Sequence, residues 1–214
     1  MPEPESPAGR RPLQSRQFLV FKKLAARLAE NGVTPNAISL TSLVFGVAAG
    51  FAFAITGISS AWLARVLFVA AAALIQLRLL CNLLDGMVAV EYQRGSSGGE
   101  LWNEVPDRFS DVATIIGAGF AFGGNVTMGV IGAILALLTA YVRALGASTG
   151  AGQIFAGIGG KPQRMFLLTV TALTAAILNR PFTLSIGLAL LCVAAAATVV
   201  HRLILVRNHL YAHR

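Results

Sequence analysis

Long apolar segments, separated by short breaks rich in glycine, proline, asparagine and serine, dominate the chain beyond residue 33. Each segment is close to the ~20 residues that a helix needs to cross a bilayer. The breaks contain the residues that most often interrupt helices. The pattern therefore predicts six transmembrane helices, at residues 34–56, 61–90, 102–123, 126–147, 163–179 and 182–206.

The segment before these helices has a different pattern. In residues 15–31, apolar side chains can share one helical face while Arg16, Lys22 and Lys23 point elsewhere. This is typical of a basic amphipathic helix lying on a membrane surface, although a helix that packs on the bundle would show the same pattern. Residues 1–14 are rich in Pro, Glu and Arg and are expected to be disordered. Residues 32–214 would then form one six-helix transmembrane domain that also holds the chemistry.

The composition agrees with a membrane protein. Hydrophobic residues make up 56% of the chain and charged residues only 12%, and the mean hydropathy is +0.71. A soluble domain carries roughly 25% charged residues. We therefore predict an all-α integral membrane fold. The net charge of +8 comes from basic residues scattered at helix ends, which indicates contact with membrane lipids and argues against binding to nucleic acid.

The distribution of Lys and Arg predicts the orientation. With six spans both chain ends lie on one side, and nearly all the basic residues fall on that side. Only Arg65 and Arg180 fall on the other side, and Arg78 lies within a span. Because basic loops stay in the cytoplasm, we expect both termini to be cytoplasmic, most simply at a bacterial inner membrane.

Acidic residues are confined to one window of the membrane domain. After Glu30, every one of them falls between Asp85 and Asp111, and none follows Asp111. Carboxylates close to hydrocarbon are costly and usually bind a cation, relay protons or catalyse a reaction. The window adjoins the predicted cytoplasmic side, so we expect the functional site there.

The spacing within this window places oxygen-bearing side chains on two helix faces. Asn82 and Asp85 are three residues apart, and Asn103, Asp107 and Asp111 follow one another at intervals of four. Both spacings put side chains on a single helical face. An all-oxygen set with no His or Cys nearby suits a hard cation such as Mg²⁺, Mn²⁺ or Ca²⁺. A phosphorylated lipid is the natural substrate for such a site at the membrane interface.

Two motifs connect these residues to a known family. The first reads Asn82-x-x-Asp85-Gly86-x-x-Ala89-Val90, and the second, after a short loop, reads Gly99-x-x-x-Asn103-x-x-x-Asp107. They resemble the signature of the CDP-alcohol phosphotransferases, Asp-x-x-Asp-Gly-x-x-Ala-Arg followed by Gly-x-x-x-Asp-x-x-x-Asp. The segments Thr34-Pro35-Asn36, Tyr141-Val142-Arg143-Ala144 and Lys161-Pro162-Gln163-Arg164 resemble the same family. The chain departs from the signature where Asn82, Asn103 and Val90 replace two aspartates and the arginine.

The resemblance implies a metal-dependent phosphatidyltransferase. Such enzymes move a substituted phosphoryl group from a CDP-linked donor, here CDP-diacylglycerol, to an alcohol acceptor and release CMP. The resemblance assigns the Mg²⁺ or Mn²⁺ ligands to Asn82, Asp85, Asn103 and Asp107, with Asp111 as a compensating ligand. It assigns the role of base to Asp107, and it is compatible with a homodimer. It also assigns contacts with the nucleotide to Gly86, Ala89, Gly99 and Arg94, with Arg94 standing in for the missing arginine.

Basic residues on later segments are candidates for acceptor binding. Arg143, Lys161 and Arg164 would hold a phosphate on the acceptor, as in family members that use phosphorylated acceptors. Anchoring of the helices by the positive-inside rule predicts the same residues. Leu145 lies where relatives often have a second arginine, which weakens the case for a phosphorylated acceptor.

Other interpretations remain open at this stage. Asp85 and Asp107 would also suit structural ion pairs with Arg78, Arg108 or Arg143, and Glu91, Glu100, Glu104 and Arg108 would suit a solvated helix end. A register shifted to Asp107 and Asp111 would place Asn103 at the signature glycine. The whole chain could also be a binding protein without catalysis or a small transporter, the latter favoured by Arg78 within a span.

Overall fold

The computed structural model describes residues 18–92, 98–178, 180 and 182–212, and within them it contains seven helices and no strands. Residues 1–14, for which disorder is predicted, and Arg94 lie outside the described residues. The helices are α1 (Leu19–Glu30), α2 (Pro35–Thr56), α3 (Ala61–Glu91), α4 (Gly99–Phe120), α5 (Val126–Ser148), α6 (Lys161–Leu178) and α7 (Thr183–Ala212). The all-α fold predicted from the sequence is confirmed.

Local capping residues set the starts of two helices. Thr34 precedes α2, and its side-chain oxygen accepts a hydrogen bond from the Ala37 amide at 3.3 Å, with Pro35 at the first helical position. Asn125 does the same for α5 by accepting from the Met128 amide at 2.9 Å. Such caps satisfy amide groups that have no partner within the helix.

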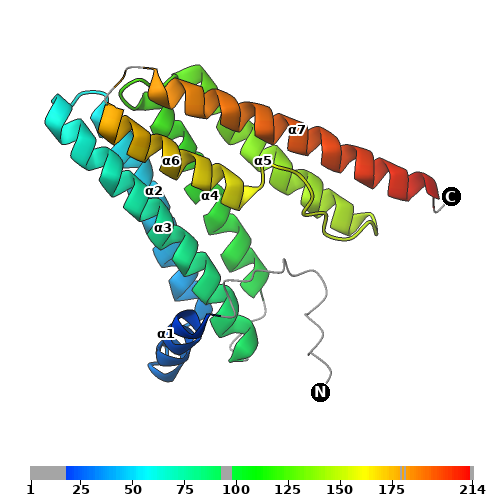
Figure 1. Ribbon diagram of the computed structural model, residues 1–214. Helices are drawn as coiled ribbons and strands as arrows, with labels where there is room; N and C mark the ends of the chain where they lie inside the picture. The colour runs from blue at the N-terminus through cyan, green and yellow to red at the C-terminus, as the bar shows by residue number, and fades with distance from the viewer. Residues whose placement is uncertain (1–17, 93–97, 179, 181, 213–214) are drawn as a thin grey trace.

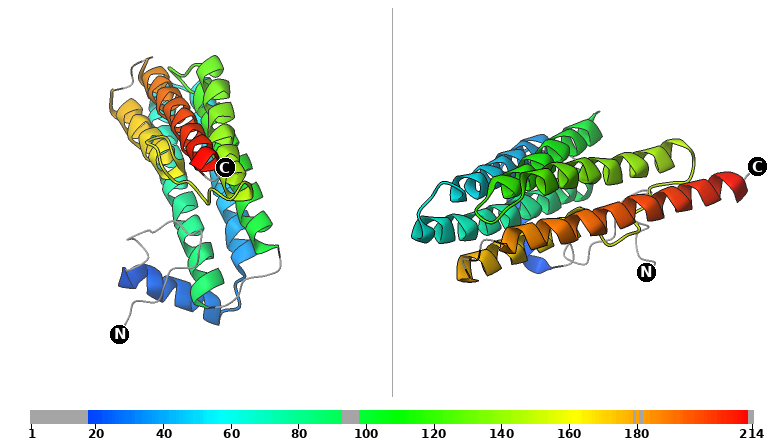
Figure 2. Two further views of the ribbon diagram at one scale, coloured as in Figure 1. Left: turned by 90° about the vertical axis from the view of Figure 1, so that its right-hand side faces the viewer. Right: turned by 90° about the horizontal axis from the view of Figure 1, so that it is seen from above.

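The helices are arranged in two diverging groups. α3 and α4 both pack along α2, while α5 packs against α4 and α7. The ribbon shows the first group separating from α5 and α7 toward the ends near residues 91 and 212 (Figure 1). α6 lies between α3 and α7 (Figures 1 and 2). The space between the diverging groups is where the cavity described below opens.

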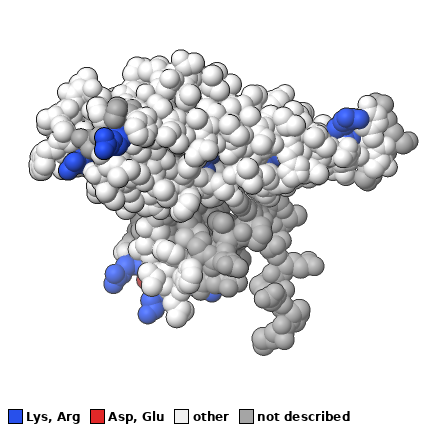
Figure 3. All heavy atoms as spheres, turned by 45° about the horizontal axis from the view of Figure 1, so that its top comes forward, with Lys and Arg blue, Asp and Glu red and all other residues white. Residues whose placement is uncertain are grey.

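Four helices, α2, α3, α5 and α7, have the length and apolar composition needed to cross a bilayer. α4 and α6 fall short of that standard, since α4 carries charged residues as far as Asp111 and α6 begins with Lys161 and Arg164. The structure therefore supports an integral membrane fold, and the number of six spans remains a prediction. Large apolar side chains on the outside of the bundle, such as Phe51 and Val193, are more than 60% exposed. Uncharged residues cover most of the face drawn in Figure 3, as contact with lipid requires.

α1 crosses the end of α3 (Figure 1). Ala25 and Ala29 are buried against a cluster that includes Leu84, Met87 and Val88 of α3. Lys22, Lys23 and Arg27, on the other side of α1, are exposed. The helix thus packs on the bundle, which was the alternative considered from the sequence, and its placement at the membrane surface remains a prediction.

Glycines let three helices approach to backbone contact. A Cβ added to Gly117 of α4 would lie 2.2 Å from the carbonyl oxygen of Gly50 on α2. A Cβ on Gly129 of α5 would lie 2.9 Å from the Cα of Gly119 on α4. Small residues at such crossings are the usual basis of helix packing in membranes. They hold α4, which contributes most of the site, between α2 and α5.

Replacing Gly117 with valine should separate α2 from α4. Because the neighbouring atoms are backbone, the helices must move, and overpacking of this kind typically costs about 1–3 kcal/mol. We expect a clear drop in the thermal unfolding temperature of Gly117→Val in detergent. Ala197→Val, on an exposed position of α7, is the matched control. Equal unfolding temperatures for the two variants would contradict the close packing of α2 and α4.

Candidate active site

Carboxylates from α3 and α4 are buried close to one another. Asp85 on α3 is 2% exposed, and Asp107 and Asp111 on α4 are 8% and 0% exposed. The Asn103 amide on α4 donates to Asp85 Oδ2 at 2.9 Å, which joins the two helices directly. Ser39 on α2 donates to the same oxygen at 2.8 Å. The predicted convergence of Asp85 and Asn103 is therefore present.

Asp85 differs from the other two carboxylates in that no ion pair with it is found among the described residues, although Lys161 attracts it from a distance. Among the described residues it forms hydrogen bonds but no ion pair, and its Oδ1 is buried without a hydrogen-bond partner. Asn82, one turn earlier, accepts a hydrogen bond from Ser42 through its amide oxygen at 2.9 Å. A buried carboxylate oxygen without a partner is costly and calls for a cation or a donor.

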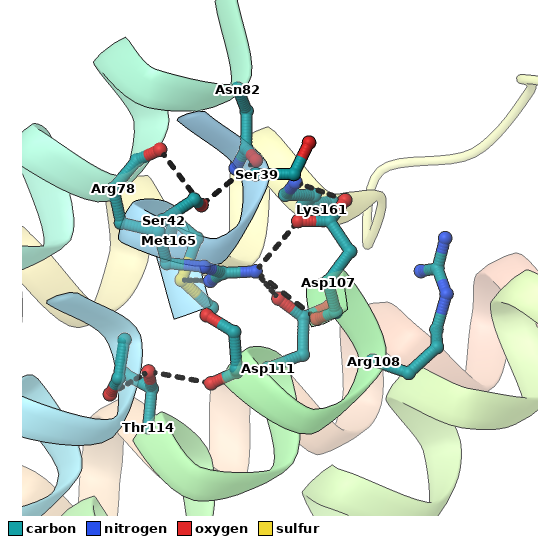
Figure 4. A network of polar contacts seen from close by, with 12 residues as sticks. Ser39, Ser42, Arg78, Asn82, Asp107, Arg108, Asp111, Thr114, Lys161 and Met165 are labelled. Carbon is teal, nitrogen blue, oxygen red and sulfur yellow. Dashed lines mark hydrogen bonds and ion pairs between the residues drawn. The ribbon is translucent and has the colours of Figure 1, made fainter. Parts of the chain in front are cut away.

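Asp107 lies between two basic residues. Its Oδ2 forms an ion pair with Lys161 Nζ at the start of α6, and its Oδ1 lies 3.6 Å from Arg78 Nη2 (Figure 4). Burial lowers the pKa of Lys161, although the neighbouring Asp107 carboxylate opposes that shift. The structural ion pair considered from the sequence is thus present at Asp107. It does not account for the buried carboxylate of Asp85.

Asp111 has a different role from the one predicted. Its Oδ1 lies 2.5 Å from Arg78 Nη2 (Figure 4). Its Oδ2 lies 2.7 Å from Arg164 Nη2. Guanidinium groups therefore hold both oxygens at 2.5 and 2.7 Å, which argues against the metal-ligand role expected for Asp111. Asp107 differs because it lines the cavity. The alternative register with Asp107 and Asp111 as the final metal-binding pair loses support for the same reason.

Arg78 is the fully buried centre of this network. Besides Asp111, it donates to the Asp107 carbonyl oxygen at 3.3 Å and lies 2.9 Å from Met165 Sδ. An arginine in an apolar span needs such partners, because an unpaired buried charge is strongly unfavourable. The paired state of Arg78 removes the feature that favoured a transporter.

A cavity of about 660 Å³ opens beside these residues. Its lining includes Asn82, Asn103, Asp107 and Lys161, and also the three predicted acceptor-binding residues Arg143, Lys161 and Arg164. This volume is in the range typical of small-molecule and cofactor sites. The predicted nucleotide contacts Gly86, Ala89 and Gly99 are partly exposed, and none of them is among the residues that line this cavity.

The three predicted acceptor-binding residues already have protein partners. Arg164 is 2% exposed and, besides Asp111, donates to Thr139 Oγ1 at 3.0 Å and the Gly159 carbonyl oxygen at 2.7 Å. Arg143 Nη2 lies 2.6 Å from Glu104 Oε1. The structure places all three at the cavity, and Arg164 serves mainly to hold α6 against α4.

Several residues at the site were missed from the sequence. Glu104 forms ion pairs with both Arg143 and Arg108, whereas a solvated helix end was expected there. The spacing of Glu104 and Arg108 was visible in the sequence, but the contact with Arg143 joins two helices and has no local signal. Arg202 of α7 also lines the cavity and donates to the Thr139 carbonyl oxygen at 2.7 Å.

The candidate ligands for a divalent cation are oxygens of carboxylate and amide side chains. Within the described part of the chain, no group of three or more His, Cys, Asp or Glu side chains gathers as a metal site. Two carboxylates and two amides are present instead, from Asp85, Asp107, Asn82 and Asn103. These oxygens suit a hard cation, and the buried, unpartnered Oδ1 of Asp85 is the position that most requires one.

Arg78 should be essential for stability. Arg78→Met leaves the Asp111 carboxylate buried with one guanidinium fewer, and removing one partner of a buried pair costs about 3–5 kcal/mol. We expect a large fall in thermal unfolding temperature in detergent, partly restored in Arg78→Met/Asp111→Asn. Arg65→Met, at an exposed position of the same helix, should have little effect. Equal stability of the Arg78 and Arg65 variants would refute the role of the network.

Comparison with known proteins gives relatives of this architecture, although no family model matches the chain. "Inner membrane protein YnbA" of Escherichia coli (strain K12) is 25% identical over 150 residues, which cover 70% of this chain and 72% of that protein.

The solved structures of Mycobacterium tuberculosis phosphatidylinositol phosphate synthase (PgsA1) are similar over most of their length. The form with CDP-DAG bound has a TM-score of 0.74 at 23% identity, covering 88% of this chain and 94% of that chain. The apo form has a TM-score of 0.69 at 26% identity, covering 86% and 94%. The complex with manganese and citrate has a TM-score of 0.73 at 24% identity, covering 87% and 88%. The chain therefore has the fold of this synthase, which agrees with the resemblance to the CDP-alcohol phosphotransferases seen in the two motifs.

Proposed function

We propose that this protein is a metal-dependent CDP-alcohol phosphatidyltransferase of phospholipid biosynthesis. It transfers a phosphatidyl group from CDP-diacylglycerol to a polar alcohol and releases CMP. The observation that carries the proposal is the meeting of the α3 and α4 motifs beside a cavity, with a buried, unpartnered carboxylate oxygen on Asp85. The fold shared with a synthase solved with CDP-DAG supports the choice of donor.

Asp85 and Asp107, with the amide oxygens of Asn82 and Asn103, would hold Mg²⁺ or Mn²⁺. A divalent cation there supplies the positive charge that stabilises the pyrophosphate and the departing CMP. Manganese in one structure of the synthase supports this assignment. Gly86, Ala89, Gly99 and Arg94 remain the proposed contacts of the nucleotide.

Asp107 is the proposed base. The acceptor hydroxyl oxygen forms a new bond to the lipid-bearing phosphorus, the bond from that phosphorus to the CMP oxygen breaks, and the hydroxyl proton passes to the Asp107 carboxylate. Lys161 and Arg78 hold this carboxylate on opposite sides, so its position is defined before substrate binds. Arg143 and Lys161 lie at the cavity where the acceptor would bind.

The orientation of the reaction follows from the charge pattern. The strong excess of Lys and Arg on the side of the termini supports a site at the cytoplasmic face, where a soluble acceptor and CMP would be accessible. We also propose, from the resemblance alone, that the protein can form a homodimer.

A binding protein that has lost catalysis is the second candidate. The observation that favours it is the state of Asn103, whose amide donates a hydrogen bond to Asp85 and so acts as a donor where the signature has a carboxylate. Such a protein would bind the nucleotide or lipid and release no CMP.

Asp107→Asn should remove most of the transferase activity. The amide cannot accept the hydroxyl proton, and loss of a general base costs about 10²-fold or more in rate. The measurement is CMP release from CDP-diacylglycerol in detergent with Mn²⁺ and a panel of alcohols. Glu91→Gln, at the exposed end of α3, is the control and should keep wild-type activity. CMP release by Asp107→Asn at the wild-type rate would rule out Asp107 as the base.

Restoring the signature carboxylates should strengthen metal binding. Asn82→Asp/Asn103→Asp adds two negative charges beside Asp85, so we expect tighter binding of Mn²⁺, measured from the free-ion signal in electron paramagnetic resonance titrations. Without metal the added charges repel Asp85, so the variant should also be stabilised by Mn²⁺ more than the wild type. Unchanged affinity together with unchanged stabilisation would argue that these positions do not face the cation.

A further inference from the structure

Glu104 projects into the same cavity as the proposed base. It lies one turn before Asp107 on α4, so the two carboxylates share a helical face, and both line the cavity. Its side chain is 43% exposed, unlike the buried Asp107 and Asp111. Among the carboxylates of α4 whose side chains the structure describes, Glu104 is therefore the one that an entering ligand meets.

One carboxylate engages guanidinium groups from two helices. Glu104 Oε1 lies 2.6 Å from Arg143 Nη2 on α5, and Oε2 forms an ion pair with Arg108 one turn later on α4. Arg143 also stacks over the Phe155 ring at 5.6 Å, which holds its guanidinium plane in place. The two arginines are about 20% exposed and face the cavity.

The remaining basic groups of the cavity have other partners, although the Lys161 side chain is as exposed as that of Arg143. Lys161 is paired with Asp107, Arg164 with Asp111, and Arg202 with backbone carbonyl oxygens of α5 and residue 156. Guanidinium forks are the groups best suited to bind a phosphate. Because Lys161 is paired with the proposed base, an acceptor phosphate would rely mainly on Arg143 and Arg108, which Glu104 already occupies.

Glu104 makes the binding of such a phosphate unfavourable. The phosphate must displace the carboxylate from both arginines or lie beside it, and like charges placed side by side are strongly disfavoured. A hydroxyl group without a phosphate can instead hydrogen-bond to Glu104 and Arg143 where they stand. We infer that Glu104 makes this site select an acceptor alcohol that carries no phosphate group. The inference rests on the proposed transferase function.

The test compares acceptors that differ only in a phosphate, namely glycerol with glycerol 3-phosphate and inositol with inositol 1-phosphate. CMP release is measured for the wild type, Glu104→Gln and the control Glu91→Gln. We expect the wild type to prefer the unphosphorylated member of a pair. Glu104→Gln should shift the ratio at least about tenfold toward the phosphorylated member, which corresponds to about 1.4 kcal/mol. A wild-type preference for phosphorylated acceptors, or an unchanged ratio in Glu104→Gln, would overturn the inference.

A binding measurement separates this inference from the proposed function. Isothermal titration of glycerol 3-phosphate should show tighter binding to Glu104→Gln than to the wild type or Glu91→Gln. The gain should be lost in Glu104→Gln/Arg143→Gln. If no acceptor yields CMP, the proposed function fails, and the titration still decides whether Glu104 excludes phosphate. Equal affinity of Glu104→Gln and the wild type for glycerol 3-phosphate would count against the inference that Glu104 excludes phosphate.

Discussion

The site depends on one buried carboxylate, Asp111, whose two oxygens are held by Arg78 and Arg164. These three residues belong to α4, α3 and α6, so the network joins three helices at the depth where the cavity ends. Buried ion pairs contribute little net stability, but breaking one is costly, which makes the arrangement strongly selective for one geometry. With α4 fixed in this way, Asp107 lies one turn nearer the cavity and Glu104 one turn nearer still.

The described carboxylates of α4 therefore become more exposed from Asp111 through Asp107 to Glu104. Asp111 is enclosed by two guanidinium groups, Asp107 lies between Lys161 and Arg78, and Glu104 faces Arg143 and Arg108 at the more exposed end. Asp85, opposite them on α3, has hydrogen bonds from Ser39 and Asn103 and no ion pair in the described part of the chain. A cation from solution is most needed at Asp85, whose neighbours Asn82 and Asn103 line the cavity.

The features that were predicted correctly depend on residues that are close together in the sequence. The starts predicted at residues 34 and 126 agree closely with those of α2 and α5, because the breaks before these helices depend on adjacent residues. The meeting of the two motifs was also predicted, because helical spacing and a short connecting loop bring them together, but the hydrogen bond from the Asn103 amide to Asp85 was not. α4 begins at Gly99, three residues earlier than predicted, since its polar first turn carries no apolar pattern.

Contacts between distant helices were not predictable in the same way. Nothing local distinguishes Asp111 as the partner of Arg78 and Arg164, and its spacing from Asp107 favoured a metal ligand instead. The partnership of Glu104 with Arg143 likewise depends on how α4 and α5 cross, which glycines at the crossing permit and the apolar pattern does not encode.

The most direct test is the position of Mn²⁺ in crystals grown with CDP, located by its anomalous scattering. The account predicts a manganese peak between α3 and α4, with Asp85 and Asp107 as ligands and the CDP phosphates beside it. A structure with CDP bound, in which Asp85 and Asp107 point away from each other or the manganese lies elsewhere, would contradict it.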